Sequence, residues 1–142
     1  MLITSKEKVQ KPFVNVTGER VYEMVGKPAR LGGATKHSFG YAVIPPNCSS
    51  RLHYHPQAEE TYYMLKGEGR LVIDGVEHNV RPGDAILISP PEKHQIFNEG
   101  GEDLEFVVVC APAWEPDNSV FLDNPTTGKP IVRNSERGPG SQ

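Results

Sequence analysis

Glycine and proline recur so closely along this chain that a long helix has hardly anywhere to form. The 142 residues include 14 glycines and 13 prolines, spread through the sequence. Glycine weakens a helix interior through its backbone entropy, and proline breaks it because it lacks an N–H donor. Between them lie short apolar runs rich in valine, isoleucine and aromatic residues, at intervals of roughly 8 to 12 residues. This spacing predicts an all-β fold, either a sandwich or a barrel.

The predicted strands are short and are separated by turn residues. They cover positions 13–16, 20–25, 37–44, 51–55, 61–65, 69–73, 76–80, 85–88, 94–97 and 104–110. Asp74 and Gly75 form a two-residue hairpin loop between two of these strands, because glycine tolerates the positive φ that such a turn requires.

A chain of 142 residues is expected to form a single domain around one core. We divide it into an N-terminal segment with one or two strands (1–36), a barrel core (37–112), a segment that packs back on the barrel (113–123) and a flexible C-terminal tail (124–142). The tail is rich in glycine, proline and charged residues. The segment before it contains Trp114 and Phe121 and is too apolar for a solvated linker.

The charge of the chain excludes several classes of partner. The formal net charge is -3, from 18 acidic and 15 basic residues, and neither sign is gathered into a run. We therefore expect neither nucleic acid nor an anionic membrane as a partner. No apolar run approaches the ~20 residues that span a bilayer, and the N-terminal residues lack the apolar region of a secretory signal, so a cytoplasmic location is expected.

The two cysteines predict neither a disulfide scaffold nor a redox motif. Cys48 and Cys110 are far apart and form no CxxC pair. Each is expected to be a reduced, small buried hydrophobic residue.

Two histidines and a carboxylate come together within a short stretch. His53 and His55 are two positions apart, so on an extended strand their imidazoles leave the same face. Glu60 follows after a turn that contains a proline, and His94 supplies a further nitrogen donor downstream. Three neutral imidazoles and one carboxylate suit a divalent transition metal better than a hard ion such as calcium.

Strand periodicity selects among the neighbouring side chains. Glu59 competes with Glu60, but only Glu60 shares a strand face with Tyr62 and Met64. On the strand predicted to begin at His94, this histidine shares its face with Ile96 and Asn98. His37 and His78 lie outside these patterns and are expected to be structural or solvated.

Arg51 and Tyr62 each have two interpretations. Arg51 lies two positions before His53, so it is either an inward cation that binds a substrate carboxylate or phosphate, or an arginine on the rim in water. Tyr62 is either a packing residue or a hydrogen-bond donor to a bound ligand. With Glu60, the best candidate for a proton acceptor, these are the candidate catalytic residues.

The stretch from His53 to Gly67, HYHPQAEETYYMLKG, resembles the first motif of the cupin superfamily, H-x-H, three or four residues, Glu, six residues, Gly. The segment from Gly83 to Asn98 resembles the second motif, with H-x-x-x-N intact at His94. Asn47 and Pro91 stand where these motifs usually have glycine. The resemblance implies a double-stranded β-helix (jelly-roll) barrel that binds one metal through His53, His55, Glu60 and His94, usually as a homodimer.

Four protein ligands leave one or two metal positions for water, dioxygen or a chelating substrate. Iron, manganese, nickel or copper at such a site favours dioxygenase-type oxidation, and zinc, cobalt or manganese favours Lewis-acid chemistry; the sequence does not choose the metal. We expect an enzyme for a small polar, chelating organic molecule, with dioxygenase-type oxidoreductase ahead of a sugar-type isomerase or epimerase, a cyclase or a decarboxylase. A non-catalytic metal or metabolite-binding protein is the rival hypothesis.

Outward apolar side chains predict a homodimer. On the last core strand, Val107 and Val109 lie opposite the inward Phe106 and Val108. With the apolar residues of the predicted strand at 13–16, they form a surface that a second subunit is expected to cover, through exchange of the N-terminal strand between the subunits.

Overall fold

The computed structural model describes residues 1–131 of the chain. Its regular elements are antiparallel strands and three short 3₁₀ turns, η1 (Lys6–Lys8), η2 (Ala29–Leu31) and η3 (Pro116–Asn118). In this part of the chain no helix has the length and apolar character needed to cross a membrane.

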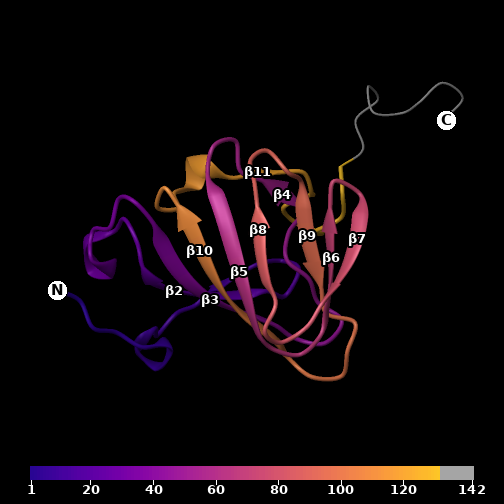
Figure 1. Cartoon of the computed structure of the whole chain (residues 1–142), viewed down its shortest axis with the longest axis horizontal. Helices are drawn as coiled ribbons and strands as arrows, with labels where there is room; N and C mark the ends of the chain where they lie inside the picture. Colours follow the sequence, from indigo (N-terminus) through magenta and orange to yellow (C-terminus); the bar gives the residue numbers. More distant parts are fainter. Residues whose placement is uncertain (132–142) are drawn as a thin grey trace, which may run out of the picture.

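The strands form two sheets (Figure 1). The six-stranded sheet has the order β1 (Phe13–Val14), β2 (Arg20–Val25), β3 (Ser38–Ile44), β10 (Leu104–Ala111), β5 (Glu59–Lys66) and β8 (Ala85–Ile88). The five-stranded sheet has the order β11 (Val120–Phe121), β4 (His53–Tyr54), β9 (His94–Phe97), β6 (Gly69–Ile73) and β7 (Val76–Val80). From β3 onward the chain crosses between the sheets at each step except the β6–β7 hairpin. This is a jelly roll, so the predicted all-β double-stranded β-helix is confirmed.

Three strands differ in length from the prediction, two because of their partner strands and one because of a turn. The strand expected at 51–55 is reduced to the two residues of β4, because β11 pairs with it only at Tyr54 and His53. The strand expected at 61–65 is longer, because β10 pairs with β5 from Glu59 to Lys66. The strand expected at 13–16 ends at Val14, because the next residues form a turn in which the Gly18 N–H donates to the Asn15 carbonyl at 2.9 Å.

The core lies between the two sheets and follows the predicted alternation. On β5, the side chains of Glu60, Tyr62 and Met64 are buried, while Glu59 and Tyr63 are exposed. The apolar cluster contains Ala42, Ile44, Tyr62, Met64, Leu71, Val80, Ile88, Ile96, Leu104 and Phe106. The inner face of β5 therefore carries both core residues and, at its start, the carboxylate of Glu60.

The N-terminal strands extend the larger sheet beyond β3 (Figure 1). β1 pairs with β2, and β2 pairs with β3, within the same chain. The segment before β1 covers part of the outer face, since Lys6 Nζ lies 4.8 Å from the centre of the Tyr22 ring and 5.0 Å from that of Tyr41. On the same face Val107 and Val109 are half-buried.

The segment at 113–123 runs back to the strand that carries two of the histidines. On β11, Phe121 pairs with His53 of β4, and the Leu122 N–H donates to the Leu52 carbonyl at 2.9 Å. Residues 124–131, expected to begin a flexible tail, form instead a hydrogen-bonded loop in which the Ile131 N–H donates to the Leu122 carbonyl at 2.8 Å. The remainder of the predicted tail, 132–142, lies outside the described residues.

Candidate metal centre

Both sheets contribute to a cluster of four ligand-type side chains. His53 belongs to β4 and pairs with His94 of β9, His55 follows β4, and Glu60 belongs to β5. One ligand atom from each of these residues lies within 4.8 Å of the others. His55, Glu60 and His94 are buried, and His53 is half-buried. The structure thus brings together the four side chains that the sequence predicts as ligands and leaves Glu59 exposed outside the cluster.

Backbone carbonyl groups fix the protonation of all three imidazoles. The Nδ1 atoms lie 2.7 Å from the carbonyl oxygen of Arg51 for His53, 2.9 Å from that of Asn118 for His55, and 2.9 Å from that of Glu92 for His94. A carbonyl oxygen only accepts a hydrogen bond, so each Nδ1 carries a proton. The neutral ring then presents the lone pair of Nε2, the form that binds a metal.

The Nε2 atoms and the Glu60 carboxylate oxygens are arranged so that a cation could bind between them. His55 Nε2 and His94 Nε2 are buried and have no hydrogen-bond partner among residues 1–131. They lie 3.0 and 3.3 Å from the carboxylate oxygens of Glu60. Nitrogen lone pairs and carboxylate oxygens repel one another at this distance unless positive charge lies between them. Nitrogen and oxygen donors in this number suit one divalent transition metal.

The ionisation of the cluster agrees with this role. Burial, together with His94, lowers the pKa of His53 to about 3. Burial alone would raise the pKa of Glu60, but His55 and His94 outweigh it and hold that pKa below its usual value. Burial opposes the charge of His55, but Glu60 outweighs this effect and raises the pKa of His55. A metal ion at this site would compete with protons for the same nitrogen and oxygen atoms.

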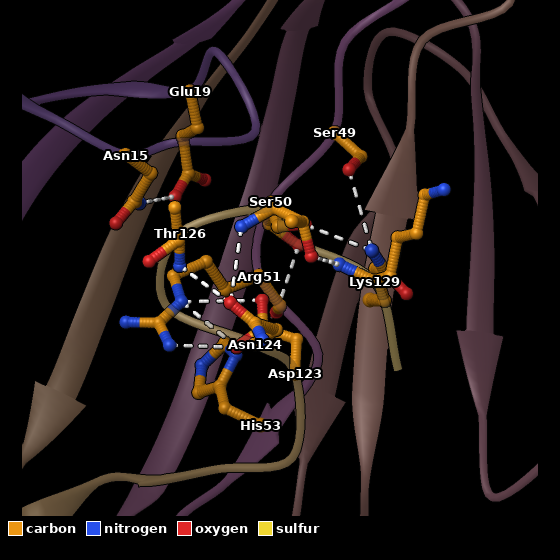
Figure 2. Close-up of polar contacts among 12 residues, drawn as sticks. Asn15, Glu19, Ser49, Ser50, Arg51, His53, Asp123, Asn124, Thr126 and Lys129 are labelled. Atoms are coloured by element: carbon orange, nitrogen blue, oxygen red, sulfur yellow. Dashed lines mark hydrogen bonds and ion pairs between the residues drawn. The ribbon is translucent and has the colours of Figure 1, made fainter. Parts of the chain in front are cut away.

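Arg51 is neither a free cation in the cavity nor an arginine in water (Figure 2). Its Nε and Nη2 atoms donate to Asp123 Oδ1 at 2.9 and 2.7 Å, and Nε also lies 3.1 Å from Oδ2. Its guanidinium carbon lies 3.8 Å from the centre of the Phe121 ring. The Asp123 side chain is fully buried, so the positive charge of Arg51 is compensated within the protein.

Tyr62 lies between the metal cluster and the core. Its ring is 6.3 Å from that of His94 and 4.7 Å from that of Phe106, measured between centroids. Burial, reinforced by the charges of Glu60 and Glu19, raises the pKa of Tyr62 well above its usual value. The phenol stays protonated, so it can donate a hydrogen bond to a ligand in the cavity.

A cavity of about 750 Å³ opens beside the cluster. His53, His55 and Glu60 line it together with Arg51 and Tyr62. The rest of its wall comes from Glu19, β2, β3, β10 and the segments at 9–15, 26–31 and 114–121. Many of these wall residues are apolar. The volume is in the range of sites for drug-sized organic molecules.

Two polar residues of this region escaped the sequence analysis. Asp123 is 72 positions from Arg51, and nothing in its local sequence indicates the contact. Glu19 lines the cavity, and burial raises its pKa to about 8, with Asn15 opposing and Glu60 reinforcing the shift. The alternation of Glu19, Val21 and Glu23 before and within β2 is the only sequence pattern that places Glu19 inward.

Known proteins share this architecture. A family model for the cupin domain matches residues 40–110. The oxalate-binding protein of Thermotoga maritima is 38% identical over 113 residues, covering 77% of this chain and 92% of that protein.

Solved structures with a TM-score of 0.68 to this chain include a polyketide cyclase and an oxalate oxidase. The polyketide cyclase RemF of Streptomyces resistomycificus is 25% identical, with 89% of this chain and 90% of that chain covered. Oxalate oxidase in complex with the substrate analogue glycolate is 26% identical, with 84% of this chain and 63% of that chain covered.

Proposed function

The chain belongs to the cupin family, and on this premise we propose that it is a metal-dependent enzyme for a chelating organic substrate. One observation carries the proposal: ligand atoms of three imidazoles and of the Glu60 carboxylate lie within 4.8 Å of one another, and His53, His55 and Glu60 of this cluster line a cavity of about 750 Å³. Residues His53, His55, Glu60 and His94 would hold one divalent transition metal.

The substrate class follows from the donor set and the cavity. A bidentate enediol, β-diketone or hydroxy acid would place its two oxygens at the positions that four protein ligands leave open. The cavity has room for a much larger molecule than oxalate, and its partly apolar wall suits a chelating group attached to an apolar body. Arg51 adds little net charge for a second anionic group, because Asp123 compensates it.

The chain's own residues would bind and orient this substrate. When bound, the metal would supply Lewis acidity and, if redox-active, electron transfer with dioxygen. The protonated Tyr62 would donate a hydrogen bond to a substrate oxygen, and the stacked Arg51 and Phe121 would form one side of the cavity. We place dioxygenase-type oxidation first among the reactions, in line with the oxalate oxidase neighbour.

Two other functions have specific support. The likeness to the polyketide cyclase RemF favours Lewis-acid cyclisation or a related isomerisation or decarboxylation. The relative named an oxalate-binding protein favours a non-catalytic binding protein. In each case the same four ligands hold the metal, and we further propose that the protein acts as a homodimer.

Metal analysis followed by oxygen uptake tests these functions. The protein is purified without added metal, its metal content is measured, and oxygen consumption is followed with a panel of enediols, β-diketones and hydroxy acids. Iron, manganese, nickel or copper with uptake supports the oxygenase. Zinc with turnover but no uptake supports the Lewis-acid enzyme, and metal without any turnover supports the binding protein.

Ligand variants make the test specific. His53→Ala and His94→Ala are expected to lose stoichiometric metal and all turnover while keeping the far-ultraviolet circular dichroism of a β protein, because the apolar core lies elsewhere. His78→Ala is the matched control, since this histidine is exposed on β7. Full metal occupancy in both ligand variants would overturn the assignment.

A further inference from the structure

A second buried carboxyl group lies in the wall of the cavity, on a different element from the metal ligands. Glu19 precedes β2 and lines the same cavity as Glu60, His53 and Tyr62. Its side chain is buried, with 9% of its surface exposed. Four glutamates line the cavity, Glu19, Glu23, Glu60 and Glu115. Only Glu19 and Glu60 of these four are buried, and they come from two separate parts of the fold.

A tight turn holds Glu19 in place (Figure 2). Asn15 Nδ2 donates to Glu19 Oε1 at 2.8 Å, and the Asn15 N–H donates to the Glu19 carbonyl at 2.8 Å. Gly18 has a φ of +98°, and a Cβ there would collide with the Cys48 side chain. The orientation of the Glu19 side chain is therefore set by the turn and does not depend on a charged partner.

Glu19 also lacks the partner that a structural carboxylate would need. Among residues 1–131, no lysine, arginine or histidine forms an ion pair with Glu19. A buried carboxylate without a cation is unfavourable. Burial accordingly raises the pKa of Glu19 to about 8, so both its acid and its base form are accessible near neutral pH.

The two carboxyl groups thus have opposite environments. Glu60 is ionised between two histidines, whereas the one side-chain partner of Glu19 among residues 1–131 is the Asn15 amide. Two titratable groups whose surroundings separate their pKa values divide the roles in acid–base catalysis. Glu60 stays a ligand, and Glu19 is the group that is free to gain and lose a proton.

We propose that Glu19 is the acid–base residue of this site and that its substrates are α-hydroxy ketones or related enediol precursors. The ionised carboxylate takes the proton from the carbon that bears the hydroxyl group: the C–H bond breaks, its electron pair remains in the enediolate, and an O–H bond forms on Glu19. The Glu19 carboxylic acid then exchanges its proton with solvent and protonates the same carbon of the enediolate, which restores the hydroxy ketone with a solvent hydrogen on carbon and leaves Glu19 ionised again. This inference rests on the proposed function, since it requires the substrate to be chelated by the metal.

Hydrogen exchange in a model substrate tests the inference without oxygen chemistry. Zinc-loaded protein in D₂O is mixed with 2-hydroxyacetophenone, and replacement of the carbon-bound hydrogen by deuterium is followed by proton NMR. The wild type is expected to accelerate exchange, and Glu19→Gln, which preserves the Asn15 hydrogen bond, should slow it by roughly 100-fold or more. Glu7→Gln, an exposed change of the same charge in the N-terminal segment, should match the wild type.

Two further readouts separate a catalytic from a structural effect. Zinc stoichiometry and the dissociation constant of the probe, measured by calorimetry, should stay within about twofold in Glu19→Gln. A Glu19→Gln variant that exchanges like the wild type, or that loses zinc or probe together with exchange, would overturn the role of Glu19.

The remaining outcomes distinguish this inference from the proposed function. Wild-type protein that binds zinc and the probe but catalyses no exchange contradicts the Glu19 proposal and leaves the metal assignment intact. Wild-type protein that binds no zinc contradicts the proposed function, and the Glu19 proposal falls with it.

Discussion

Arg51 and Asp123 form a buried ion pair that joins the C-terminal segment to the strand of the metal ligands (Figure 2). Arg51 Nη2 lies 2.7 Å from Asp123 Oδ1, and the side chains are 15% and 0% exposed. The carbonyl oxygen of the same Arg51 accepts the hydrogen bond from His53 Nδ1 at 2.7 Å. Asp123 thereby holds the residue that orients one of the metal ligands.

Asp123→Ala is expected to destabilise the fold and weaken metal binding together. Removing one member of a buried pair leaves an uncompensated charge, which lowers the free energy of unfolding by roughly 3 to 5 kcal/mol. Loss of the support for His53 should reduce metal affinity by about 10-fold or more. Urea unfolding and metal titration measure the two effects.

Two controls identify the cause of that loss. Lys27 and Glu115 also approach to 2.8 Å, but their side chains are 51% and 42% exposed, so Lys27→Ala should change stability by less than about 1 kcal/mol. Combining Arg51→Met with Asp123→Leu removes both charges and should recover much of the stability lost in Asp123→Ala. Equal losses in Asp123→Ala and Lys27→Ala would contradict the importance of burial.

Glu60→Gln is expected to lose far more metal affinity than Glu59→Gln. Glu60 is 5% exposed and lies against His55 and His94, whereas Glu59 is exposed on the opposite face of β5. Metal titration monitored by calorimetry compares the two isosteric variants. Similar affinities, or the reverse order, would mean that the carboxylate ligand is misassigned by one residue.

The Glu19 carboxyl group should make stability depend on pH. Its pKa rises from 4.5 to about 8 on folding, so the folded protein retains a proton that the unfolded chain releases. The resulting stabilisation is complete below pH 4.5 and is lost as the pH rises towards 8. Between these limits the wild type should lose a few kcal/mol of unfolding free energy, at about 1.4 kcal/mol per pKa unit.

Urea unfolding of metal-free protein across this pH range measures the effect. Glu19→Gln removes the titrating group and should show a flatter pH profile than the wild type, whereas Glu7→Gln should follow the wild type. Parallel profiles for the wild type and Glu19→Gln would show that the carboxyl group is ionised throughout. This measurement requires no substrate and therefore examines the protonation of Glu19 by itself.

Part of the metal cluster was predictable from local sequence, whereas His94, which lies far from the other three residues in the sequence, was placed in the cluster by the resemblance to the second cupin motif. Two positions along a strand return a side chain to the same face, which places His53 with His55 and selects Glu60 over Glu59. The lengths of β4 and β5 were not predictable in the same way, because partners distant in the sequence, β11 and β10, determine where their pairing ends.

The two polar residues that the sequence analysis missed depend on long-range docking. From the sequence, Arg51 could either bind a substrate anion or lie in solvent. Its contact with Asp123 forms only because the C-terminal segment packs back against the barrel. In the sequence, Glu19 looks like an ordinary turn residue. It faces the cavity because β2 pairs with β3, which directs the inner face of β2 towards the cavity. The alternation of side chains along a strand predicts which face of the sheet such a residue lies on, but it does not predict which residues from distant parts of the chain contact it.

A homodimer formed through the outer face of the larger sheet is the last prediction. Val14 on β1 is 59% exposed and Tyr63 on β5 is 46% exposed. Val107, which is half-buried on β10, pairs with Tyr63. An apolar surface that spans several strands in this way marks a site of protein association. A two-fold dimer would cover it without strand exchange, because β1 already pairs with β2 of its own chain.

Sedimentation velocity at micromolar concentration measures the predicted dimer. Val14→Asp places a charge on the proposed interface and should shift the protein towards the monomer, while its exposure leaves the fold of each subunit intact. Val76→Asp is the matched control, because this valine is 58% exposed on β7 of the other sheet, and this variant should remain dimeric. A wild-type protein that sediments as a monomer, or a Val76→Asp variant that dissociates as readily as Val14→Asp, would refute this interface.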